Sequence, residues 1–268
     1  MPTAFETEIL TLSPVLNWDM SVDINNDIIS DGSDIATMTD VPTLGTAGVG
    51  PTGAGDVTIN PNGAGYYDRN GMPTSTTNDT AGTLIISAII DTSPAANQAL
   101  FSCGEKSSGS KTMALHVQTT GNLRWINVTN GFSSNASRNE CTTPVALADA
   151  TYHFLAIRQK ADGSTGIEMY VDGTWEAVTE TLVGTGTVDD WFGTFATSVT
   201  GHDAWRFGRS SSTSATTILD GEISHAAIWD TALSDAQILS LYTTWSGGVS
   251  FANKTIRRKG RRLFSPNV

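Results

Sequence analysis

The chain has 268 residues, of which 39% are hydrophobic and 16% are charged, and its net charge is −12. This length and hydrophobic content are enough for one large core, and abundant Gly, Ser and Thr with few helical patterns indicate many short strands joined by turns. No run of about 18 apolar residues occurs, which excludes a membrane-spanning helix. The start has no basic region followed by an apolar run, so we do not expect a secretory signal.

The net charge is divided unevenly along the chain. Residues 1–253 hold nine Lys and Arg and all 27 acidic residues, which gives an acidic body of charge −18. Repulsion from phosphate makes nucleic-acid binding by this body unfavourable. The last fifteen residues hold six basic residues, which could bind nucleic acid, dock on an acidic neighbouring subunit, or form a solvated terminus. They are Lys254, Arg257, Arg258, Lys259, Arg261 and Arg262.

We therefore expect a single domain over residues 1–250, with a loop-rich opening over 1–75, and a basic tail over 251–268. The segment 44–71 contains eight glycines and little periodicity, with one short strand possible at 56–59. Cys103 and Cys141 are too few for a disulfide framework, and we expect two reduced thiols.

Strand signals become frequent after residue 80. Residues 83–90 are apolar on both faces, as in a strand with layers on both sides. Residues 111–128 predict a hairpin that turns near Gly121, with an inward set of Met113, Leu115, Val117, Leu123 and Trp125.

Further strands are expected at 152–159 and 166–178, where Asp172-Gly173 is typical of a type I′ turn. Residues 180–203 are less regular, and 204–208 form another strand candidate. Some ten to twelve strand candidates at these intervals are typical of a β-sandwich.

The segment 218–242 predicts a turn, a closing strand and a helix. Ser234 and Gln237 are spaced as a capping box, and Leu233 and Ile238 as a hydrophobic staple. A helix with one apolar face then ends near Gly247.

Three segments, in this order, resemble laminin-G-like members of the concanavalin A-like lectin/glucanase superfamily. They are TLIISAIIDTSPAANQALFSCGEKSSGSKTMALHVQTTGNLRWINV (83–128), TYHFLAIRQKADGSTGIEMYVDGTWEAV (151–178) and AWRFGRSSSTSATTILDGEISHAAIWDTALSDAQILSLY (204–242). The resemblance covers roughly residues 82–245. It implies an all-β jelly-roll sandwich of two antiparallel sheets with one short C-terminal helix.

The same resemblance bears on catalysis and metal binding. Glycosidases of the superfamily use a Glu-x-Asp-x-x-Glu strand, which is absent here. Asp220 and Glu222 are better explained as a turn entering a strand, so no catalytic residue is predicted and the chain is expected not to be an enzyme. No cofactor is expected. Calcium remains possible because laminin-G-like relatives often bind it, but its ligands cannot be chosen and Ser224-His225 replaces a common acidic pair.

Sugar recognition would need exposed aromatic side chains, and these could equally be core residues. The candidates for glycan contact are Tyr67, Trp191, Phe192 and Trp205.

Three functional hypotheses follow. The first is a virion (phage) structural or decoration protein, made in the cytoplasm, displayed on the particle surface and docked through the basic tail. The second is an extracellular carbohydrate-binding lectin or adhesin, and the third is a glycoside hydrolase. The expected partners are other virion or assembly proteins, cell-surface glycans, and further copies of the chain.

Overall fold

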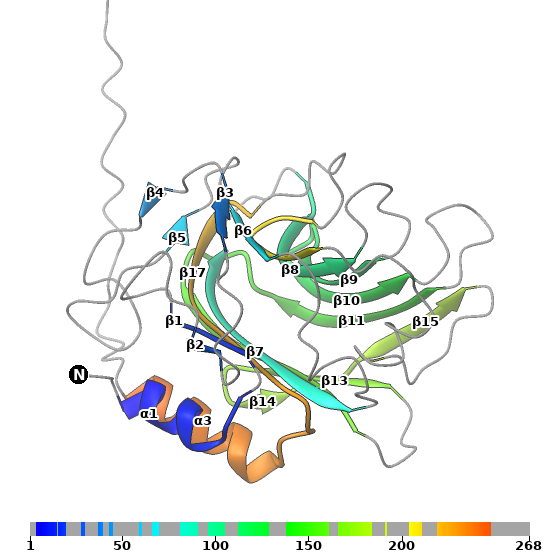
Figure 1. The fold of residues 1–268 in the computed structure, drawn as a ribbon. Coiled ribbons are helices and arrows are strands. Elements are labelled where there is room, and N and C mark those ends of the chain that lie inside the picture. The colour runs from blue at the N-terminus through cyan, green and yellow to red at the C-terminus, as the bar shows by residue number, and fades with distance from the viewer. Residues whose placement is uncertain are drawn as a thin grey trace, which may run out of the picture.

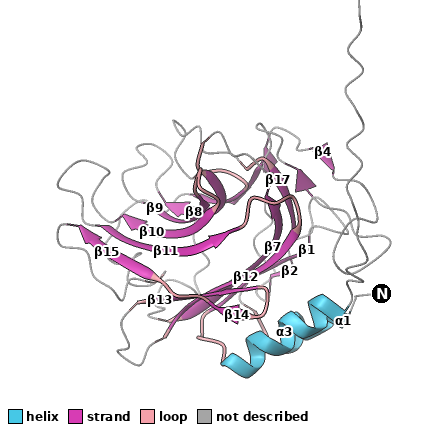
Figure 2. Ribbon diagram, turned by 180° about the vertical axis from the view of Figure 1, so that it is seen from behind, coloured by secondary structure: helices cyan, strands magenta, loops and turns pink. Residues whose placement is uncertain are grey.

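The computed structural model describes residues 4–14, 16–19, 28–29, 37–39, 43–44, 59–60, 66–69, 81–90, 96–104, 112–128, 138–160, 166–183, 191, 204–210 and 219–247. Within them, the strands form two curved sheets packed face to face, with two helices at one side (Figures 1 and 2). This confirms the predicted all-β sandwich with a C-terminal helix. It adds a helix at the N-terminal end that was not predicted.

The first sheet, called sheet A, has a continuous path of antiparallel strands with two further strands attached to it. The path runs β14 (Thr174–Trp175), β13 (Ile167–Val171), β12 (Tyr152–Gln159), β7 (Gly82–Ile90), β17 (Gly221–Trp229), β1 (Leu16–Asp19) and β2 (Ile28–Ile29). Strand β5 (Ile59–Asn60) pairs with β17 and with β4 (Thr43–Leu44).

The second sheet, called sheet B, is also antiparallel. Its order is β15 (Thr179–Val183), β11 (Arg138–Ala146), β10 (Asn122–Val128), β9 (Thr112–Val117), β8 (Gln98–Gly104), β16 (Ala204–Phe207), β6 (Tyr66–Arg69) and β3 (Thr37–Thr39). Strands β9 and β10 form the predicted hairpin, and Gly121 adopts φ 86° at its turn.

The main core lies between the sheets and contains the whole predicted inward set of the β9–β10 hairpin. Sheet A contributes alternate residues of β7, such as Leu84 and Ile86, and Ile228 of β17. All nine residues of β7 are buried, as expected for a strand covered on both faces.

The helices α1 (Ala4–Thr11) and α3 (Asp235–Gly247) cover the outer face of sheet A (Figure 2). Phe5 and Ile9 of α1 pack in the same cluster as Ile238 and Trp245 of α3. The capping box of α3 is confirmed, because Gln237 N–H donates to Ser234 Oγ (3.3 Å) and Ser234 N–H donates to Gln237 Oε1 (2.8 Å).

A buried arginine fastens α3 to sheet A. Arg158 of β12 is 2% exposed, contacts Glu168 (2.6 Å) and Asp235 (2.7 Å), and lies over the Trp175 ring. Its guanidinium also donates to the Leu233 carbonyl. A charge this deeply buried is tolerated because each side of the guanidinium has a partner.

The two cysteines are buried and unpaired, which confirms the expected free thiols. Cys103 is on β8 and Cys141 on β11, with β9 and β10 between them. Three strand spacings are about 14 Å, whereas a disulfide needs Cα atoms within about 7 Å. Burial raises the pKa of Cys141 to about 12, with a smaller contribution from the charge of Glu180.

Trp191, which the sequence left open as either a glycan contact or a core residue, is a core residue. Its side chain is fully buried and stacks on Trp125 of β10, with ring centroids 5.3 Å apart and planes at 16°. A β-carbon on Gly82 would overlap the indole nitrogen of Trp191, so the absence of a side chain at Gly82 lets the ring pack against β7.

We expect Trp191→Ala to lower the free energy of unfolding by about 3–5 kcal/mol, because it leaves a large cavity in the core. Trp191→Phe should cost less, since an aromatic ring still stacks on Trp125. Urea unfolding of the two variants and the wild type measures the difference. A Trp191→Ala protein as stable as the wild type would contradict this placement.

Candidate functional site

The two sheets differ in what their outer faces carry. The outer face of sheet A is sealed by α1, α3 and an apolar cluster. Along β9 and β10, residues on the outer face of sheet B alternate with core residues. The outer residues include His116 and Arg124. Sheet B therefore supplies the polar outer face among the described strands.

The centre of this face is a short chain of polar contacts across β9, β10 and β11, which we call the His116 site. Arg124 is in register with His116 on β9 and with Thr142 on β11. Its Nη2 lies 3.2 Å from His116 Nδ1, and its Nη1 lies 3.9 Å from Glu140 Oε2. The side chains of Arg124 and Glu140 are 15% and 20% exposed, so this side of the site reaches solvent.

Burial, aided by the charge of Arg124, lowers the pKa of His116 to about 3. The imidazole is therefore neutral at physiological pH. A guanidinium can only donate, so His116 Nδ1 accepts the bond from Arg124 and the ring proton resides on Nε2.

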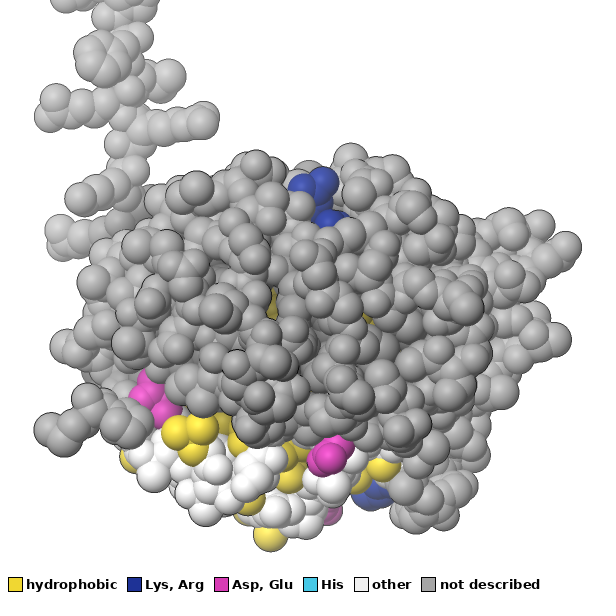
Figure 3. Space-filling model, viewed as in Figure 1, with side chains coloured by type: hydrophobic (Ala, Val, Ile, Leu, Met, Phe, Trp, Pro, Cys, Tyr) yellow, Lys and Arg dark blue, Asp and Glu magenta, His cyan; other side chains and the backbone are white. Residues whose placement is uncertain are grey.

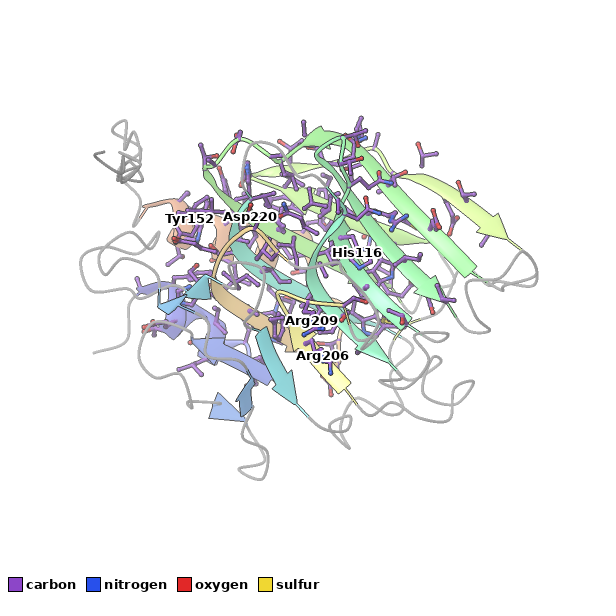
Figure 4. All side chains as sticks on the ribbon, turned by 90° about the horizontal axis from the view of Figure 1, so that it is seen from above. His116, Tyr152, Arg206, Arg209 and Asp220 are labelled. Carbon is purple, nitrogen blue, oxygen red and sulfur yellow. The ribbon has the colours of Figure 1, made fainter. Side chains whose placement is uncertain are left out.

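The same face continues onto β8 and β16, where further cationic groups lie. Arg206 is in register with Ser102, and its Nη1 donates to the Ser210 carbonyl (3.2 Å). Ser102 Oγ donates to the Arg209 carbonyl (2.8 Å). Figure 4 labels His116, Arg206 and Arg209 in a view from above, and β8 separates the strand of His116 from that of Arg206. In the space-filling view, Lys and Arg side chains reach the surface at the top of the molecule and at its lower right (Figure 3).

An apolar patch adjoins the polar groups. Ala114, Ile126 and Val128 form a buried cluster separate from the main core. Ala114 precedes His116 by two residues, and Ile126 follows Arg124 by two, so the patch and the His116 site share one face. The three side chains are at most 1% exposed, so this part of the outer face is covered.

Two other predicted site residues, Trp205 and Tyr67, lie on the paired strands β16 and β6, two positions apart in register. Trp205 is on β16 in register with Cys103, and Tyr67 is on β6 in register with Phe207. Phe192 and the tail over 251–268 lie outside the described residues. His116 and Arg124 were missed, although the alternation of the predicted hairpin already placed both opposite its inward set.

Asp220 and Glu222 behave as the sequence predicted. Asp220 lies in a bend and β17 begins at Gly221. The backbone N–H of Asp220 donates to Gln98 Oε1 (3.2 Å), and Glu222 accepts a bond from Tyr152 OH (3.3 Å). Their contacts join this turn to neighbouring strands.

A buried Ser-His-Glu series occurs under α1. Ser224 Oγ lies 3.2 Å from His225 Nδ1, and His225 Nε2 lies 3.6 Å from Glu6 Oε1. Ser224 is fully buried and donates to the Ser87 carbonyl. A nucleophile must reach its substrate, so this series serves to join α1 to β17. Among the described residues, no group of three or more His, Cys, Asp or Glu could hold a metal ion.

A charged clamp joins the end of β12 to two tight turns. His153 Nδ1 lies 2.6 Å from Asp172 Oδ2, and His153 Nε2 lies 3.0 Å from Asp149 Oδ1. Both ring nitrogens face carboxylates, so both donate and the ring is an imidazolium. Asp172, at the predicted turn, has φ 46°, and Ala150 beside Asp149 has φ 59°, so the clamp fixes two strained turns.

The electrostatics of the clamp agree with its geometry. Burial alone would lower the pKa of His153, but the bond to Asp172 and the charges of Asp172 and Asp149 outweigh it and raise that pKa. Burial would raise the pKa of Asp149, but its bonds to Thr151 and the charge of His153 lower it.

The described strands thus form a sandwich of two antiparallel sheets. The sequence matches the concanavalin A-like lectin/glucanases superfamily over residues 62–239, about two thirds of the chain. The chain therefore belongs to this family. None of the described helices is long and apolar enough to cross a membrane.

Solved structures share the fold at low sequence identity. The binding domain of botulinum neurotoxin serotype C1 aligns with a TM-score of 0.57 and 11% identity, over 88% of this chain and 53% of that chain. A Trypanosoma rangeli sialidase in complex with 2,3-difluoro-KDN aligns with a TM-score of 0.57 and 15% identity, over 90% and 34%. This chain thus spans about half the length of the neurotoxin binding domain and about a third of the length of the sialidase. A search of curated proteins finds no match.

We expect His153→Gln to lower the free energy of unfolding by about 2 kcal/mol near pH 5, because two bonds to a charged group are lost. In the folded protein the pKa of His153 is raised above the ordinary histidine value of about 6.5. The stabilisation by His153 is therefore complete at a pH below that ordinary value, and it disappears as the pH rises through the raised pKa. Urea unfolding of both proteins from pH 5 to pH 9 should show the difference shrinking. A difference independent of pH would contradict an imidazolium clamp.

Proposed function

We propose that the protein is a non-catalytic glycan-binding module that recognises its ligand on the outer face of sheet B. The observation that carries this proposal is the asymmetry of the two outer faces. Helices cover sheet A, whereas sheet B carries the His116 site, partly open at Arg124 and Glu140. Membership of a lectin and glucanase family is in keeping with a saccharide ligand.

The polar groups of this face can hydrogen-bond a saccharide. A sugar offers hydroxyl oxygens, and Arg124 supplies several N–H donors in a fixed plane. Its contact with Glu140 is long and partly exposed, and such ion pairs contribute at most about 1 kcal/mol. A ligand that displaces Glu140 from the guanidinium therefore loses little from that ion pair.

We expect Arg124→Ala to weaken glycan binding at least about tenfold, because a hydrogen bond to a charged group contributes about 1.5–3 kcal/mol. Lys160→Ala is the matched control, since it removes one positive charge on sheet A, where Lys160 pairs with Glu168. Screening on a glycan array followed by calorimetry provides the measurement. An array without any bound glycan would overturn the proposal, as would equal losses in the two variants.

A second proposed function concerns display on a particle. The charge asymmetry favours it, because a tail of +6 follows a body of −18 and can dock on an acidic assembly partner. The protein would then be a virion structural or decoration protein that presents sheet B outward, in several copies. Display on a particle surface and glycan binding are compatible with each other.

Deletion of residues 254–268 should leave the sandwich folded and abolish attachment to particles, because the deletion removes all six tail charges. Co-sedimentation with intact particles measures attachment, and circular dichroism with thermal unfolding confirms the fold. Substituting Ala for Lys106 and Lys111, which lie in the body, controls for loss of charge alone. Attachment that survives the deletion would reject docking through the tail.

A further inference from the structure

Strand β15 is the longest of the strands that end the described sheets. It closes one end of sheet B with five residues, whereas β3 closes the other end with three, and β14 and β2 close sheet A with two each. Among the described strands it pairs only with β11, so its other edge has no partner strand there. Figures 1 and 2 show β15 at the margin of the molecule, on the side away from α1.

The strand lacks the features that usually protect a sheet edge from pairing. Natural edge strands carry Lys, Pro or a β-bulge, or are very short. The sequence of β15 is TETLV, with neither Lys nor Pro, and its register with β11 is unbroken. The side chains from Thr179 to Leu182 are exposed, and Leu182 is 49% exposed. An unprotected edge that contains β-branched residues favours the addition of another strand.

The sequence of β15 complements itself when two copies run antiparallel. If Thr181 lies opposite Thr181 of the second copy, Glu180 lies opposite Leu182 and Thr179 opposite Val183. All five residues are then paired, and no acid faces an acid. Thr–Thr pairs are favourable, whereas like charges directly opposite are destabilising. A register centred on Glu180 would place two carboxylates opposite each other, so the pairing has one favoured register.

The charge of Glu180 is bound within its own copy. Asn139 Nδ2 of β11 donates to Glu180 Oε1 at 2.7 Å. In register, Glu180 lies beside Cys141, which belongs to the main core. The carboxylate is therefore held by β11 of the same copy. The net charge of −12 still makes two copies repel each other, and salt weakens that repulsion.

We propose that β15 pairs with β15 of a second copy, which gives a two-fold symmetric dimer whose two B sheets form one continuous sheet. Both copies use the same surface, as in the commonest class of homodimer. Five paired residues make a small interface, so the dimer is reversible and depends on concentration. The outer faces of both B sheets then point the same way, and a ligand that carries two recognised groups can engage both copies.

Sedimentation of the full chain over a range of concentrations measures the dimer. We expect the dimer to be the main species at about 0.5 mM protein, as for a Kd of about 0.1 mM, and to dissociate on dilution. It should persist at high salt, which screens the repulsion between two acidic copies. A mass of one chain at that concentration would overturn the proposal. A dimer that high salt dissolves would do so too, because it would assign the contact to the basic tail.

Charges introduced at position 181 test the register. Thr181 opposes itself in the dimer and pairs with Glu140 of β11, so Thr181→Glu should abolish dimerisation. Mixing this variant with Thr181→Lys should restore a dimer with one copy of each, because unlike charges then face each other. Thr174→Glu, the same change at an exposed residue of β14, is the matched control and should leave the dimer unchanged. A dimer that persists in Thr181→Glu, or a mixture that stays monomeric, would refute the pairing of β15 with itself.

Amide hydrogen exchange of the wild type gives a readout that needs no variant. We expect amides of β15 to exchange more slowly as the protein concentration rises, because pairing protects those on its outer edge. Amides of β14 should not respond. If sedimentation shows a dimer and no amide of β15 gains protection, the interface lies elsewhere and the proposal fails.

Discussion

The structure depends on the burial of both faces of sheet A. Strands β7 and β17 are nine residues long, and their side chains are packed against sheet B on one side and against α1 and α3 on the other. A strand enclosed in this way has no position left for a polar ligand. The outer face of sheet B, in contrast, carries the polar side chains of His116, Arg124 and Arg206.

The fold was largely predictable because its signals are local. Alternation identified the core set of β9 and β10, the Asp172-Gly173 pair identified a turn, and Ser234 with Gln237 identified a helix start. Helix α1 was missed because eight residues, with Phe5 and Ile9 as its apolar pair, give a weak periodic signal. Its burial comes from contact with α3, more than 220 residues away in sequence.

The candidate site was harder to predict because it depends on pairing between strands. The sequence left Trp191 open between a glycan contact and the core, because its segment has no periodicity and sequence alone could not reveal the stack on Trp125. The contact of Arg124 with His116 needs the register of the hairpin and the shared face of β9 and β10. The sequence held both residues, but nothing in their spacing distinguished a recognition face from an ordinary solvated one.

Two arginines differ in how far the fold encloses them. Arg158 is 2% exposed and is held by Glu168, Asp235 and the Trp175 ring where α3 begins. Arg124 is 15% exposed, with Glu140 at 3.9 Å and the neutral imidazole of His116 at 3.2 Å. The guanidinium of Arg158 is therefore closed off from solvent, whereas that of Arg124 is partly exposed.

The separation of the two cysteines by two strands has a consequence for where the protein can operate. With Cys103 and Cys141 on β8 and β11, no intramolecular cross-link can form without breaking sheet B. The thiols are also buried, and the raised pKa of Cys141 keeps it protonated and unreactive. A change in the redox state of the surroundings therefore cannot join these two thiols to each other within the folded sheet.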